Sequence, residues 1–257
     1  MSANESGTTV LTVADGVARI SWTSDETLDA VRHEVAAALM THHRVEALVD
    51  PADEKGQRTA TWSGLRREGV MRGVTVDGAP VDRIVYARVE TDVPAHEPEG
   101  FRALLNSFLP RKRAIGQFLI RDSNDRVLLC QLTYKSDWDL PGGVIEVGES
   151  PAVGVSREVE EELALDLKAG PLLLTDWLPP WSGWDDAVCL VYDGGVHDPS
   201  MLDAMVPEAR EIRSVAFCTL EEIRERCADF TARRIEAALA SAHGNGVTYT
   251  ESGRPVA

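Results

Sequence analysis

Two short segments decide the fold of this chain: Gly143-Val144-Ile145-Glu146-Val147-Gly148-Glu149 and, after seven further residues, Arg157-Glu158-Val159-Glu160-Glu161-Glu162-Leu163-Ala164-Leu165. A helix is expected to begin between them, because Ser150 is a favourable N-cap and Pro151 a favourable first helical residue. The glycines of the first segment allow backbone amides and carbonyls to come close to a ligand or a metal. Together the segments predict a glycine-rich, anion-binding turn that leads into an acidic helix.

The predicted helix has two distinct faces. Its apolar positions recur at helical spacing and predict a buried stripe: Ala152, Val155, Val159 and Leu163. Glu158, Glu161 and Glu162 lie on another side at i, i+3 and i+4, so they are neighbours on one face. Three like charges held that close repel one another unless a cation lies among them. Ligand sets made only of oxygen select a hard divalent ion, so the cluster predicts Mg²⁺ or Mn²⁺.

The two segments resemble the Nudix box, the signature of the Nudix hydrolases. Its pattern is met by Gly143, Glu149, Arg157, Glu158, Val159, Glu161, Glu162 and Leu165. One position departs from the pattern, because Ala164 stands where the family has Gly. Ala can take the left-handed conformation usual there at a cost of about 1 kcal/mol, or it can let the helix run on slightly.

The resemblance implies an α/β (α+β) Nudix fold, a mixed sheet sandwiched between helices. It also implies a Nudix-type pyrophosphohydrolase, a metal-dependent enzyme that cleaves a pyrophosphate bond in a nucleoside diphosphate linked to another moiety. The alternative is a non-catalytic Nudix-like sensor that binds a nucleotide metabolite. A solvated acidic helix face remains the structural alternative for the glutamate cluster. Enzymatic turnover is favoured because every carboxylate of the box is present, whereas a sensor would be free to lose them.

The resemblance directs the assignment of individual residues. We expect the metal to be bound by Glu158, Glu161, Glu162 and the carbonyl of Gly142. The residues expected to serve catalysis are Glu162, Glu161, Arg157, Glu149 and Glu211. Arg157 is expected to reach back to Glu149 and fix the glycine turn against the helix.

A further carboxylate is expected after the box, because attack on a pyrophosphate needs a water to lose its proton. Glu211 is one candidate, in a segment similar to the loop and strand that follow the box in many Nudix hydrolases. Its rivals are Glu208, Asp185 and Asp186, and a plain surface loop is the alternative. Three tryptophans, Trp177, Trp181 and Trp184, lie in one loop that can either stack a nucleobase or seal the edge of a core.

Composition excludes several classes of protein. The chain has 257 residues, 44% of them hydrophobic, and a net charge of −16, which argues against an electrostatic nucleic-acid footprint. No apolar run is long enough to span a membrane, and the polar segment Met1 to Thr9 is unlike a signal peptide. The cysteines have no metal-type spacing and suit a reducing cytosol: Cys130, Cys189, Cys218 and Cys227. A cytoplasmic enzyme with a small nucleotide-type substrate is expected, without nucleic-acid or membrane partners.

Two domains are predicted. Residues 93–110 are polar and rich in Pro at their start and are expected to form a linker. Residues 111–243 are expected to form the Nudix domain, closed by one helix from Leu220 to Ala240, and residues 244–257 a flexible tail.

Residues 1–92 resemble the C-terminal half of GNAT N-acetyltransferases. The resemblance rests on an amphipathic helix near Leu28, the turn Gly64-Leu65-Arg66-Arg67-Glu68-Gly69 and the strand around Tyr86-Ala87. The loop that holds acetyl-CoA in that family is replaced by Thr23-Ser24-Asp25-Glu26-Thr27-Leu28, which has no glycine and two carboxylates. We therefore expect a small truncated GNAT-like α/β domain without catalysis, whose open sheet edge is covered in a homodimer.

Overall fold

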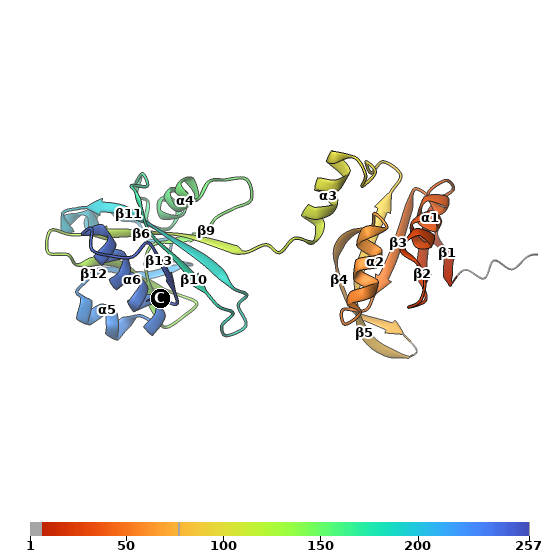
Figure 1. Cartoon of the computed structure of the whole chain (residues 1–257). Coiled ribbons are helices and arrows are strands. Elements are labelled where there is room, and N and C mark those ends of the chain that lie inside the picture. Colours follow the sequence, from red (N-terminus) through yellow and green to blue (C-terminus); the bar gives the residue numbers. More distant parts are fainter. Residues whose placement is uncertain (1–6, 77, 257) are drawn as a thin grey trace, which may run out of the picture. The chain divides into compact units, whose positions relative to one another are not determined.

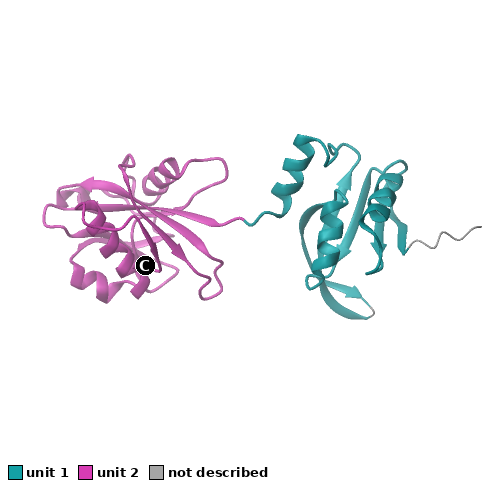
Figure 2. Cartoon of the chain, viewed as in Figure 1, with its two compact units in different colours: residues 1–110 teal, residues 111–257 magenta. Residues whose placement is uncertain are grey.

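The computed structural model describes residues 7–76 and 78–256, so the ends of the predicted N-terminal domain and of the predicted tail, residues 1–6 and 257, lie outside the described residues. The chain divides into two compact units, residues 1–110 and 111–257 (Figure 2). None of the helices in the described ranges is long and apolar enough to cross a membrane.

The first unit contains one sheet of five strands in the order β1-β2-β3-β5-β4. Its elements are β1 (Thr8–Ala14), β2 (Val17–Trp22), α1 (Leu28–Ala38), β3 (Arg44–Val49), α2 (Glu54–Trp62), β4 (Arg66–Val76), β5 (Ala79–Val89) and α3 (Pro98–Phe108). Strands β2 and β3 are parallel and pair over only three residues each, and the other neighbours are antiparallel. Helices α1 and α2 pack on the sheet through one hydrophobic cluster that includes Val31, Val35 and Ala60 (Figure 1).

The region expected to be a linker is partly helical. Helix α3 begins with a proline in its first turn and buries Leu104, which is 2% exposed. The Ser107 hydroxyl accepts a hydrogen bond from the backbone amide of Arg67 on β4 at 3.1 Å. The amphipathic spacing of this helix therefore joins residues 98–108 to the first unit, and the division between the units falls at Pro110.

The second unit contains a mixed sheet of nine strands. Its elements are β6 (Arg113–Arg121), β7 (Val127–Leu132), β8 (Trp138–Asp139), β9 (Gly142–Val144), α4 (Pro151–Leu163), β10 (Leu172–Leu178), β11 (Ala187–Val196), the 3₁₀ helix η1 (Pro199–Ala204), β12 (Ile212–Cys218), α5 (Leu220–Arg226), α6 (Asp229–Ala242), β13 (Tyr249–Glu251) and β14 (Arg254–Pro255). The main strand order is β12-β7-β6-β11-β10-β13-β14, with β8 paired to β7 and β9 to β6. The pairs β6/β11 and β10/β13 are parallel, and the others are antiparallel.

Each face of this sheet carries its own hydrophobic cluster. Phe118 and Ile120 of β6 belong to the cluster that contains Val155 and Val159 of α4. Leu119, which lies between them, belongs to the cluster formed with α5 and α6. Successive side chains of a strand point to opposite faces, so helices cover both sides of the sheet (Figure 1). The expected mixed sheet sandwiched between helices is confirmed.

Two expectations about the end of the chain are wrong. The single closing helix is two helices, because Cys227 and Ala228 take extended backbone conformations and Cys227 forms a bridge with Trp138. The expected flexible tail contains strands β13 and β14, and β13 adds to the sheet beside β10. Thr250 is fully buried there, and its hydroxyl donates to Asp176 at 2.7 Å. The polar composition of this segment led to the prediction of a tail. The prediction failed because the hydrogen-bond partners of these polar groups lie far away in the sequence.

Candidate active site

Helix α4 is positioned by its apolar stripe. Val155, Val159 and Leu163 are completely buried against the sheet, which turns the glutamate face toward the glycine turn. The helix begins as expected, with Ser150 as N-cap and Pro151 in the first turn, although the Ser150 side chain makes no capping hydrogen bond.

Ala164 takes the left-handed conformation, with φ 56° and ψ 35°, and the helix ends at Leu163. The helix therefore does not run on past Ala164, and this residue takes the strained left-handed conformation instead.

Two glycines of the turn are required by close contacts. Gly142 has φ 129°, and a Cβ there would lie 2.2 Å from the carbonyl oxygen of Gly116. At Gly143 a Cβ would lie 2.5 Å from Oε2 of Glu158. Glycine therefore lets a carboxylate of α4 pack directly against the backbone of the turn.

Arg157 holds the turn and the helix together. Its guanidinium donates to both carboxylate oxygens of Glu149, at 2.7 and 3.2 Å, so the expected bridge is present. It also donates to Glu161 at 3.0 Å, to the carbonyl of Val144 at 3.3 Å, and forms an ion pair with Glu158 at 3.1 Å. These hydrogen bonds and charges raise the pKa of Arg157 above its usual range. We call Glu149, Arg157, Glu158, Glu161 and Glu162 the box cluster.

Glu162 lies in a different environment from its neighbours. It is 7% exposed, and its carboxylate accepts one long hydrogen bond, from the amide of Gly142 at 3.4 Å. Burial raises the pKa of Glu162 to about 7, and the negative charges of Glu158, Glu211 and Asp139 act in the same direction. Within the described residues no basic side chain forms an ion pair with Glu162.

The donor set of the box cluster fits a hard cation chemically. Burial also raises the pKa of Glu158, despite the opposing charge of Arg157. Carboxylates that repel one another in this way are stabilised by a divalent cation with oxygen preference. In residues 7–76 and 78–256, however, no three His, Cys, Asp or Glu side chains are gathered closely enough to hold a metal ion. The carboxylates therefore lie on one face without converging on a common point.

The four candidates for an additional acid differ in their surroundings. Glu208 pairs with Arg210, and Asp186 pairs with Lys112. Glu211 is exposed, and its negative charge contributes to the raised pKa of both Glu158 and Glu162. The charge of Glu211 therefore acts on two members of the box cluster, without a hydrogen bond or ion pair to them in the described residues. Asp185 is linked instead to Arg113, through its backbone carbonyl.

A cavity of about 320 Å³ adjoins the glycine turn. Gly142 and Gly143 form part of its wall. Aromatic side chains form another part: Tyr134, Trp181, Trp184 and Phe230. Two of the three tryptophans singled out in the sequence therefore line the cavity, whereas Trp177 lies in β10 and is not among its lining residues.

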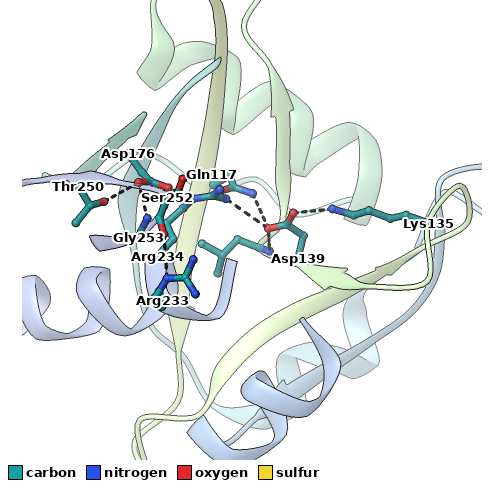
Figure 3. A network of polar contacts seen from close by, with 10 residues as sticks. Gln117, Lys135, Asp139, Asp176, Arg233, Arg234, Thr250, Ser252 and Gly253 are labelled. Atoms are coloured by element: carbon teal, nitrogen blue, oxygen red, sulfur yellow. Dashed lines mark hydrogen bonds and ion pairs between the residues drawn. The ribbon is translucent and has the colours of Figure 1, made fainter. Parts of the chain in front are cut away.

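A network of charged and polar groups, mostly buried but with the Lys135 side chain 35% exposed, lies beside this cavity and was not predicted from the sequence (Figure 3). Its members are Gln117, Lys135, Asp139, Asp176 and Arg234. Arg234 is 2% exposed and donates to Asp176 at 2.8 Å and to Gln117 at 3.0 Å. Burial alone would raise the pKa of Asp139, but the charges of Lys135 and Arg234 outweigh it and lower that pKa. We refer to these five residues as the buried network.

Together, a carboxylate-bearing helix, a glycine turn and an adjoining cavity make up the candidate site. The family model of the NUDIX domain matches residues 110–239, so the chain belongs to the NUDIX family. The expectation of a Nudix-type pyrophosphohydrolase is confirmed at the level of this family.

Known relatives match parts of the chain. A MutT-like protein of Streptomyces ambofaciens is 32% identical over 118 residues, which are 44% of this chain and 68% of that protein. An 8-oxo-dGTP diphosphatase of Proteus vulgaris is 33% identical over 69 residues, 25% of this chain and 62% of that enzyme. The solved structure of a MutT protein from Methanosarcina mazei Go1 is 23% identical, covers 54% of this chain and 99% of its own, and has a TM-score of 0.45.

Proposed function

We propose that the second unit hydrolyses a pyrophosphate bond in a nucleoside diphosphate linked to another group. The reaction requires Mg²⁺ or Mn²⁺, held by Glu158, Glu161, Glu162 and the carbonyl of Gly142. The observation that carries the proposal is the buried carboxylate of Glu162, which has acidic neighbours and no basic partner in the described residues, beside a cavity of about 320 Å³. Family membership supports the reaction class.

The residues of the chain have separate tasks in this proposal. When bound, the cation would shield the phosphate charges and lower the pKa of a water. Arg157 keeps the glycine turn in place through Glu149, which positions the substrate phosphates. Glu211 is proposed as the group that takes a proton from the attacking water, because its charge already couples to Glu158 and Glu162.

A substrate screen tests the proposal. Nucleoside diphosphate derivatives are incubated with the full chain and Mg²⁺ or Mn²⁺, and phosphate is measured after adding a phosphatase. We expect phosphate release that depends on the metal and is abolished by EDTA. Binding of a nucleotide without any turnover would instead support the non-catalytic sensor.

We further propose that the first unit is a truncated GNAT-like module without catalysis, in a cytoplasmic protein. The strand order and the short parallel pairing of β2 with β3 support the likeness. Helix α1 begins at Leu28 after Asp25 and Glu26, so the helix start carries negative charge where acetyl-CoA would bring its pyrophosphate. Calorimetry should detect no binding of acetyl-CoA, and micromolar affinity would contradict this part.

All four cysteines are free and buried, which suits a reducing compartment such as the proposed cytoplasm.

The open edge of the first unit is proposed to form a homodimer. Strand β1 lies at the end of its sheet, has no charged residue, and leaves Leu11 60% exposed. Light scattering of the full chain should give a dimer that Leu11→Lys converts into a monomer. Val206→Lys serves as the control, because Val206 is similarly exposed in the second unit. A monomeric parent chain would contradict the proposal.

A further inference from the structure

The first unit has a cavity of its own, with a volume of about 540 Å³. Two helices, α2 and α3, and two neighbouring strands, β4 and β5, contribute its lining residues (Figure 1). The volume is within the range of small-ligand sites. The start of α1 contributes none of these residues, so the cavity lies apart from the place considered above for acetyl-CoA. We call it the first-unit cavity.

The sheet side of the first-unit cavity is a cross-strand pair. Arg67 of β4 lies directly opposite Tyr86 of β5 in the strand register, so both side chains are on the same face of the sheet. Burial raises the pKa of Tyr86, against the opposing effects of a hydrogen bond with Thr61 of α2 and of the charge of Arg67. The backbone amide of Arg67 donates to Ser107 of α3 at 3.1 Å. Contacts through this pair therefore link all four elements around the cavity.

Two arginines that line the cavity have no acidic partner. Within the described residues, neither Arg58 nor Arg67 forms a salt bridge, whereas the neighbouring Arg66 pairs with Asp92 at 2.8 Å. Glu54 also lines the cavity, four residues before Arg58 on α2, but no ion pair joins the two. Positive charge is therefore in excess at this wall, in a chain whose net charge is −16. Such a wall attracts an anion.

Aromatic side chains from three elements complete the wall. They are Trp62 of α2, Tyr86 of β5 and Phe108 of α3. Trp62 follows Arg58 by four residues, so its ring and the guanidinium are neighbours on one face of the helix. Trp62 is 43% exposed, which leaves part of its ring accessible to a ligand. Aromatic surface with a few convergent polar groups is typical of a small-molecule site and not of a plain solvated helix face.

We propose that the first-unit cavity binds a small aromatic carboxylate, with Arg58 and Arg67 on the carboxylate and the aromatic side chains on the ring. The planar fork of an arginine matches a carboxylate, and flat rings pack well on aromatic walls. Two arginines against Glu54 suit a single negative charge better than a phosphate ester, which carries about two. The first unit then has a binding task that does not depend on hydrolysis by the second unit.

Calorimetric titration of the full chain with four matched probes tests the ligand class. Phenylacetate has both the ring and the carboxylate, phenylacetamide lacks the charge, acetate lacks the ring, and phenyl phosphate carries the larger charge. We expect phenylacetate to bind about tenfold more tightly than each of the others, because each lacks one of the complementary features. Equal or tighter binding of any of the three, or no binding of phenylacetate at millimolar concentration, would overturn the inference.

A matched pair of variants on one strand locates the site. Arg67→Gln removes the charge and the fork, so phenylacetate should bind about tenfold more weakly. Arg72→Gln is the control, because Arg72 also lies on β4 and forms no salt bridge in the described residues, but does not line the cavity. Arg67→Gln protein with the parent affinity, or an equal loss in Arg72→Gln, would overturn the inference.

A second variant covers the case in which Arg67→Gln does not fold by circular dichroism. Arg58 is exposed on α2, and Arg58→Gln should also weaken phenylacetate binding by about tenfold. Arg113→Gln serves as its control, because Arg113 lines the cavity of the second unit. The parent affinity in Arg58→Gln, or a loss in Arg113→Gln as large as that in Arg58→Gln, would overturn the inference.

Discussion

The box cluster and the buried network differ in their ratio of acidic to basic side chains. In the box cluster Arg157 is the one base beside four acids and pairs with three of them. Within the described residues the carboxylate of Glu162 accepts a hydrogen bond only from the amide of Gly142. In the buried network two acids face two bases, and every carboxylate oxygen accepts a hydrogen bond. The box cluster therefore carries excess negative charge, which a cation would offset under the proposed function, whereas the charges of the buried network are balanced.

The largest effect is expected from removing the unbalanced charge. Glu162→Gln keeps the shape of the side chain but removes the charge that the proposed function assigns to the metal, so turnover should fall by about a thousandfold, ~4 kcal/mol of barrier. Urea unfolding should show no loss of stability, because Glu162 forms no ion pair in the described structure and Gln removes the cost of burying a charge. Steady-state kinetics with the substrate found in the screen measure the change. Turnover within a few-fold of the parent would mean that the box cluster is not the active site.

The opposite result is expected in the buried network, where breaking a pair should cost stability. Asp176→Ala leaves the fully buried Arg234 without its closest acid, which should reduce the free energy of unfolding by about 3 kcal/mol or more. Glu236→Ala is the control, because its pair with Arg224 is partly exposed and worth about 1 kcal/mol at most. Urea unfolding of both variants makes the comparison. Equal losses would show that the buried network is no more important to stability than a surface pair.

The box cluster and the buried network also differ in how far apart their contacting residues lie in the sequence, and this separation explains which contacts could be predicted. Helical spacing places Glu161 beside Arg157, four residues away, whereas the contact of Arg157 with Glu149, eight residues back in the turn, was expected from the resemblance to the Nudix box. Arg234 contacts Gln117 and Asp176, 117 and 58 residues away, and no local pattern reports such a contact. Strands β6 and β7 are recognisable in the sequence because both of their faces are buried and give nearly continuous apolar runs. Their neighbours in the sheet depend on pairing between distant segments.

The C-terminal hairpin of β13 and β14 was not predicted, for a related reason. Thr250 and Gly253 are polar or small and resemble a tail in composition. Their hydrogen bonds to Asp176 span 74 and 77 residues of sequence. Burial of a polar side chain depends on its partner, and the partner is set by the register of β13 against β10.

A substitution of Arg157 tests whether this residue acts by positioning the glycine turn or by changing the charge at the proposed metal site. Arg157→Ala should free Glu149 and loosen the glycine turn, lowering turnover by about a hundredfold through misplacement of the substrate. Arg224→Ala is the matched control, because Arg224 lies on the surface in an exposed pair. Metal affinity, measured by calorimetry with Mn²⁺, should change less than turnover. If both variants lose activity equally, the bridge from Arg157 to Glu149 does not position the turn.

The smallest effect is expected where the box departs from the family pattern. Ala164 has φ 56°, a conformation that a side chain with a Cβ disfavours and that Gly adopts readily. Ala164→Gly should therefore raise the free energy of unfolding by about 0.5 to 1 kcal/mol, after allowing for the greater freedom of Gly in the unfolded chain. Ala237→Gly, in the middle of α6, should lower it by about 1 kcal/mol, because there the backbone is right-handed and helical. Urea unfolding distinguishes the two signs, and turnover of Ala164→Gly should stay within about twofold of the parent, since relief of this strain moves no member of the box cluster. A loss of stability in Ala164→Gly would show that the left-handed turn at the end of α4 is not strained.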